Sequence, residues 1–123
     1  MIVASIVITL VAIAAPLVMH ACAAGRIPVN QLAGIRIPSV MSSAAAWRTG
    51  HRAALPATWI GAIAAFVLAA ISFSPALPES AQSGFVIAAA IVLVGAVVVG
   101  GVFANRAALT ELAKHEQHQE HHR

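Results

Sequence analysis

Residues 34–52, "GIRIPSVMSSAAAWRTGHR", form the one long polar stretch between strongly apolar segments of this 123-residue chain. Hydrophobic residues make up 60% of the chain and charged residues only 9%, and the sequence contains no Asp and no Tyr. A soluble domain usually has about a quarter of its residues charged, so this composition cannot cover a water-facing surface. The sequence therefore predicts an integral membrane protein.

Three uncharged apolar blocks lie on either side of the polar stretch. They cover residues 2–24, 53–73 and 83–104. Each block reaches the roughly 20 apolar residues that a helix needs to cross about 30 Å of hydrocarbon. None of them alternates apolar and polar residues as a barrel strand would, and a helix satisfies every backbone amide within its own segment. We predict an all-α, polytopic membrane protein with three transmembrane helices.

The positive charges predict the domain organisation and its orientation. All seven Lys and Arg residues lie in the loop at 25–52 or in the tail at 105–123, whereas the loop between the second and third spans has Glu79 as its one charged residue. Lys and Arg are retained on the cytoplasmic side of a membrane. We therefore expect a three-helix module at 1–104 with a cytoplasmic loop, a cytoplasmic His-rich tail and an outside N-terminus.

The second half of the loop is expected to form an interfacial helix before the second span. Ser43 is a good N-cap, and the alanines after it favour a helix. Trp47 and His51 are one helical turn apart, as are Arg48 and Arg52, so these four side chains would form one patch. Trp is typical of the headgroup level, and Arg reaches lipid phosphates. The residues expected to bind a partner or anionic lipid are Arg36, Trp47, Arg48, His51 and Arg52.

Small residues recur at every fourth position in the second and third spans. Such rows let two helix backbones approach closely in lipid. Because the connecting loop is short, we expect these two spans to form an antiparallel hairpin. The residues expected to pack at this interface are Gly61, Ala65, Ala69, Ala96 and Gly100.

The tail is rich in histidine, and a helix continued past residue 104 would place three of these side chains on one face. Imidazoles at this spacing can bind zinc or copper, whereas frayed His-rich ends also occur without a ligand. The candidate ligands are His115, His118 and His122. No other cofactor is expected, no nucleic acid partner is expected, and no catalytic constellation or phosphate-binding loop is present, so the sequence does not predict an enzyme.

The polar stretch resembles the signature loop of the sporulation-delaying-toxin immunity (SdpI-type) family, which reads approximately G-I-R-T-P, then Ser, then Trp and His-Arg. The matching residues are Gly34, Ile35, Arg36, Pro38, Ser43, Trp47, His51 and Arg52. The chain departs from the family at Ile37, where Thr is common, and at Ala44 and Ala45, where acidic residues are common. The resemblance implies a bacterial inner-membrane protein of toxin immunity, in some members also capturing a cytoplasmic repressor.

Two functions follow as hypotheses. In the first, the helices recognise a membrane-active toxin and the basic loop docks a signalling partner. In the second, the chain is a small accessory subunit of a larger respiratory or transport assembly. Three spans bury little surface by themselves, so either hypothesis expects the lipid bilayer and other membrane subunits, or further copies of the chain, as partners.

Overall fold

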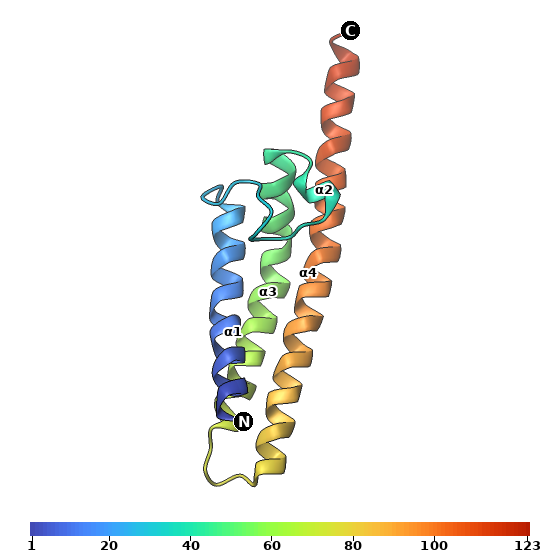
Figure 1. The fold of residues 1–123 in the computed structure, drawn as a ribbon. Helices are drawn as coiled ribbons and strands as arrows, with labels where there is room; N and C mark the ends of the chain where they lie inside the picture. The colour runs from blue at the N-terminus through green and yellow to red at the C-terminus, as the bar shows by residue number, and fades with distance from the viewer.

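The computed structural model describes residues 1–123, which fold entirely into helices, turns and loops (Figure 1). The elements in chain order are α1 (Ile2–Ala23), α2 (Pro38–Met41), α3 (Ala44–Ser72) and α4 (Glu79–His121). Three of the helices, α1, α3 and α4, are long and apolar enough to cross a membrane. The predicted all-α membrane fold with three spans is therefore confirmed.

The three long helices lie side by side, with α3 packed against both α1 and α4 (Figure 1). Contacts between α1 and α4 are few, because α3 occupies the central position. The N-terminus and the 73–78 turn lie at one end of the bundle, and α2 with the 24–37 loop lies at the other. We call the second of these the loop end, and α4 extends beyond it to the C-terminus.

Helix α3 begins at the predicted N-cap and continues without a break to Ser72. The Ser43 hydroxyl oxygen accepts a hydrogen bond from the Ala46 N–H at 3.0 Å, which satisfies one of the free amides of the first turn. The helix passes through Pro56 and is about 44 Å long at 1.5 Å per residue. The stretch expected to lie along the interface is thus the first part of α3 and not a separate element.

The small residues of α3 face α4. A Cβ atom added to Gly61 would overlap the Cβ of Ala96, so the two backbones come together at this point. Ala65 and Ala69 are fully buried further along the same face. Without a hydrophobic driving force between helices in lipid, van der Waals contact at such close approaches holds the pair together. Gly100 lies in the same interface, against Ala54 and Thr58.

A hydrogen bond joins α1 to α3 at the opposite end from the loop. The hydroxyl oxygens of Ser5 and Ser72 are 2.9 Å apart and both side chains are buried. The Thr9 hydroxyl donates to the Ser5 carbonyl oxygen at 2.7 Å, and so keeps its polar group satisfied within the helix. Interhelical hydroxyl pairs of this kind add directional contacts between two helices in lipid.

Candidate functional site

The loop after α1 is tied to α3 by two buried side chains, Trp47 and His51. The Trp47 Nε1–H donates a hydrogen bond to the Ile27 carbonyl oxygen at 2.8 Å. The Ile35 N–H donates to His51 Nε2 at 2.8 Å. The two rings are tilted by 51° with centroids 4.2 Å apart, and both side chains are at most 1% exposed. We call Ile27, Gly34, Ile35, Trp47 and His51 the loop clasp.

The hydrogen bonds of His51 assign its protonation state. A backbone N–H can only donate, so the Nε2 atom that faces Ile35 is the unprotonated acceptor. A carbonyl oxygen can only accept, so Nδ1, which is 2.7 Å from the Trp47 carbonyl oxygen, carries the proton. His51 is therefore a neutral imidazole, and both of its nitrogens are bonded to the backbone of the protein.

Gly34 allows the loop to approach the two rings. Its φ angle is +98°, in the region that residues with a side chain rarely adopt. A Cβ atom here would lie 2.7 Å from His51 Nε2 and 2.8 Å from Trp47 Cη2. Both the backbone conformation and the available space therefore require glycine, directly before the Ile35 amide that bonds to His51.

The burial of Trp47 and His51 corrects the expectation that they lie on an exposed docking patch. Neither side chain is exposed on the surface of the protein, because the 24–37 loop covers both. The sequence holds a signal for this burial. Going back along α3 from Ala65 and Gly61, the residues three or four positions apart are Thr58, Ala54, His51 and Trp47. Trp47 and His51 therefore lie on the face of α3 that packs inside the bundle.

The arginines of the predicted patch are exposed. Arg36 Nη1 donates to the Gln31 carbonyl oxygen at 2.9 Å, and the Arg48 side chain packs beside Gly25. Arg52 lies one helical turn beyond Arg48 on α3. None of the three is paired with a carboxylate, since the single ion pair in the structure joins His115 and Glu111 in the tail. Their guanidinium groups are therefore available to bind an anion.

His115 and His118 are part of α4 and His122 directly follows it, and the three do not come together as a ligand set. The His115 Nε2 atom lies 3.6 Å from the Glu111 Oε1 atom, and His118 and His122 are exposed further along the chain. No group of three or more His, Cys, Asp or Glu side chains in the structure has the arrangement of a metal site. The structure thus provides no geometric support for the zinc or copper site expected at these three residues.

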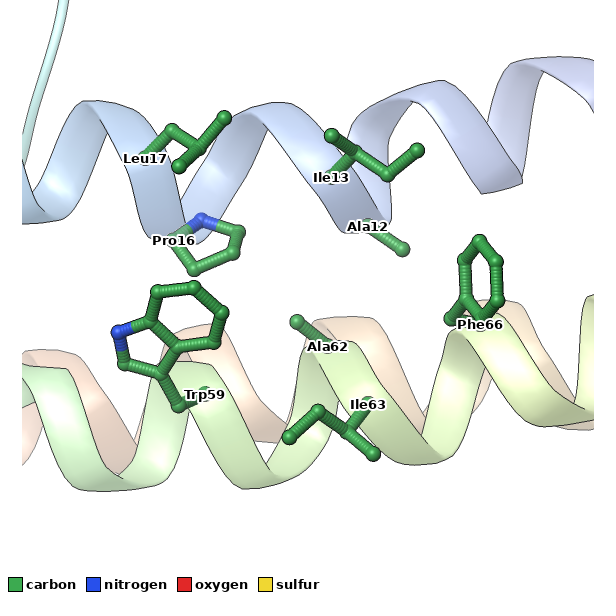
Figure 2. A pocket seen from close by; sticks show the side chains of 8 residues that line it. All are labelled: Ala12, Ile13, Pro16, Leu17, Trp59, Ala62, Ile63 and Phe66. Atoms are coloured by element: carbon green, nitrogen blue, oxygen red, sulfur yellow. The ribbon is translucent and has the colours of Figure 1, made fainter.

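Grooves open on the surface between the helices. One between α1 and α3, of about 210 Å³, is lined almost entirely by apolar side chains, and the Pro16 ring faces the Trp59 indole across it (Figure 2). A second, of about 420 Å³, lies between α3 and α4 beside Gly61. The largest of the three, about 880 Å³, lies between α1 and α4 and has Arg36 and Asn105 in its wall. Sequence reasoning identified none of these grooves.

Comparison with known proteins places the site in a family. Residues 26–103 match the model of the SdpI/YfhL protein family, and the matched region contains the loop clasp, α2, the whole of α3 and α4 as far as Phe103. Searches of curated proteins and of solved structures found no match. Because the family match covers more than half of the chain, the protein belongs to the SdpI/YfhL family of membrane proteins.

Proposed function

We propose that this protein is a non-enzymatic, immunity-type protein of the bacterial inner membrane. The loop end faces the cytoplasm, and its arginines dock an anionic partner. The observation that carries this proposal is that the aromatic and the basic side chains at the loop end have different environments. Trp47 and His51 are buried and hold the loop to α3, whereas Arg36, Arg48 and Arg52 remain exposed and unpaired.

An ordered basic surface is suited to binding an acidic one. The loop clasp holds the residue directly before each of the three arginines, so less conformational freedom is lost when a partner binds. Arginine presents a rigid set of donors that can bind carboxylate or phosphate in two places at once. The first turn of α3 contains no acidic residue, which favours an acidic partner over a basic one.

The chemistry of the site supports binding rather than catalysis. His51 is the one histidine buried in the bundle, and both of its ring nitrogens are engaged with backbone groups. A general base needs a free nitrogen within hydrogen-bonding distance of a substrate proton. The role proposed for His51 is therefore to position the loop.

Removal of two arginines tests the docking surface. We expect an Arg48→Ala/Arg52→Ala double variant, purified in mild detergent, to lose a partner that accompanies the wild-type protein. The matched control is Lys114→Ala, which removes an exposed cation from the tail and should keep the partner. Equal recovery of the partner with the double variant would contradict the proposal that these arginines dock it.

A toxin challenge tests the immunity role separately. Cells from which the gene has been deleted should be more sensitive to membrane-active peptide toxins, and the wild-type gene should restore resistance. Unchanged sensitivity of the deletion strain to a panel of such peptides would contradict the immunity role.

The accessory-subunit function is the second candidate, and the groove between α3 and α4 is the observation that favours it. Gly95 and Ala57 line this groove and offer a surface of small residues on which another transmembrane helix could pack. In this case the protein would purify with a fixed set of membrane subunits in constant ratio. The immunity proposal expects no such constant set.

A further inference from the structure

The groove between α1 and α4 has the size of a ligand site. Its volume of about 880 Å³ falls within the roughly 300–1,000 Å³ that small-molecule sites occupy. The walls are apolar and include Ala14 and Val18 from α1 and Val98 and Val102 from α4. The groove exists because α1 and α4 pack on α3 and make few contacts with each other. It is therefore open toward the lipid along its length.

The groove ends in polar groups at the loop end. The segment 32–37 crosses from α1 toward α4 (Figure 1) and contributes Arg36 to the wall, while α4 contributes Asn105. Arg36 uses one N–H group on the Gln31 carbonyl oxygen, and its other donors are unbonded. The Asn105 Oδ1 atom accepts a hydrogen bond from the Ser39 hydroxyl, which leaves the amide NH₂ group as a donor. The apolar groove thus ends in a cation and an amide donor.

We propose that this groove binds one acyl chain of an anionic phospholipid, with the lipid phosphate on the Arg36 guanidinium. Arginine can hold two phosphate oxygens through parallel N–H donors, and Asn105 adds a neutral donor beside it. A lipid with net negative charge is favoured over a zwitterionic one by the charge of the loop end. Five arginines lie at the loop end. Neither the 25–52 segment nor the part of α4 from residue 97 to residue 110 contains an acidic residue. These arginines are Arg26, Arg36, Arg48, Arg52 and Arg106.

The length of the groove favours a lipid chain over a transmembrane helix. Its walls extend over residues 11–19 of α1 and 97–105 of α4. Eight residue steps of a helix rise about 12 Å, which is less than half of the roughly 30 Å of bilayer hydrocarbon. The groove therefore spans about one leaflet. The 32–37 segment would block a helix that crossed the membrane here. An acyl chain would not be blocked, because it is joined to its headgroup at this level.

Native mass spectrometry of the full-length protein in mild detergent tests the charge requirement. We expect the wild-type protein to retain one molecule of added phosphatidylglycerol in preference to phosphatidylcholine. Arg36→Gln should weaken phosphatidylglycerol retention about tenfold, because a hydrogen-bonded charge pair is lost. Lys114→Gln removes an exposed cation of the tail that does not line the groove, and should leave retention unchanged.

A second variant tests the groove itself. Ala14 is exposed in the wall, so Ala14→Phe fills the groove without entering the helix interface, and phosphatidylglycerol should be lost. Ala70→Phe places the same ring on an exposed part of α3 outside the grooves and should retain the lipid. Wild-type retention by either Arg36→Gln or Ala14→Phe, or equal retention of the two lipids, would overturn the proposal. Occupation of the groove by a co-purifying protein subunit would overturn it as well.

Discussion

Gly34 is a residue of the loop clasp whose positive φ angle and close contacts require glycine. Replacing it with alanine forces a side chain into a positive φ conformation and against both rings. We expect Gly34→Ala to lower the free energy of unfolding by about 1–3 kcal/mol, the usual cost of holding a non-glycine residue in this region. Thermal unfolding in detergent, followed by circular dichroism, measures this change.

Gly84 provides the control for this substitution. It lies inside α4 with no atom within 4 Å of an added Cβ, so Gly84→Ala should raise stability by about 0.5–1 kcal/mol through helix propensity alone. Equal effects of the two substitutions would show that the approach of Gly34 to Trp47 and His51 does not limit stability.

His51 should be required for the path of the loop. His51→Phe preserves a ring but removes the acceptor of the Ile35 N–H, and an unpaired buried donor costs about 1–3 kcal/mol. We therefore expect faster trypsin cleavage after Arg36 in this variant. His20→Phe, at an exposed histidine of α1, should leave the cleavage rate unchanged. An unaltered rate in His51→Phe would mean that other contacts hold the loop.

The aromatic pair also shows why the loop was only partly predictable at the level of residues. Residues one turn apart share a helix face, and this holds for Trp47 and His51. Which way that face points depends on the hydrogen bonds to Ile27 and Ile35, across 20 and 16 residues of sequence. Periodicity contains no information about such contacts.

Among the elements, the contact between α3 and α4 depends on Gly61. Gly61→Ala would bring a methyl group into the Cβ of Ala96, and overpacking of this kind costs typically about 1–3 kcal/mol. Gly95→Ala is the control. Gly95 lines the same groove, but an added Cβ there has no neighbour within 4 Å, so this substitution gains the same helix propensity without a clash. The difference in unfolding free energy between the two variants isolates the clash. Equal stabilities would contradict close packing at this point.

Helix ends were predictable where a local signal exists. The first apolar block ends at residue 24 in the sequence and α1 ends at Ala23, and the Ser43 cap begins α3 as expected. The short helix α2 was not predicted, because four residues have too little periodicity to identify. The packing of the first turns of α3 inside the bundle also escaped prediction, since it depends on the loop that covers them.

For the whole molecule, the charge distribution predicts the orientation in the membrane. A membrane-impermeant maleimide should label Ser80→Cys on intact cells and Gln117→Cys only after the cells are opened. The native Cys22 is fully buried and should contribute little background. Labelling of residue 117 on intact cells would contradict the proposed orientation.

The number and order of the spans could be predicted from the three apolar blocks of the sequence. The groove between α1 and α4 could not, because it forms only when the three helices pack together.

The length of α4 has a practical consequence. Ala108 is its last buried residue, yet the helix continues to His121, which places its end roughly 20 Å further along the axis at 1.5 Å per residue. A fluorescent reporter fused after Arg123 would be separated from the helix bundle by this exposed part of α4. It would sample bulk solution clear of the headgroups and leave the arginine-bearing surface unobstructed.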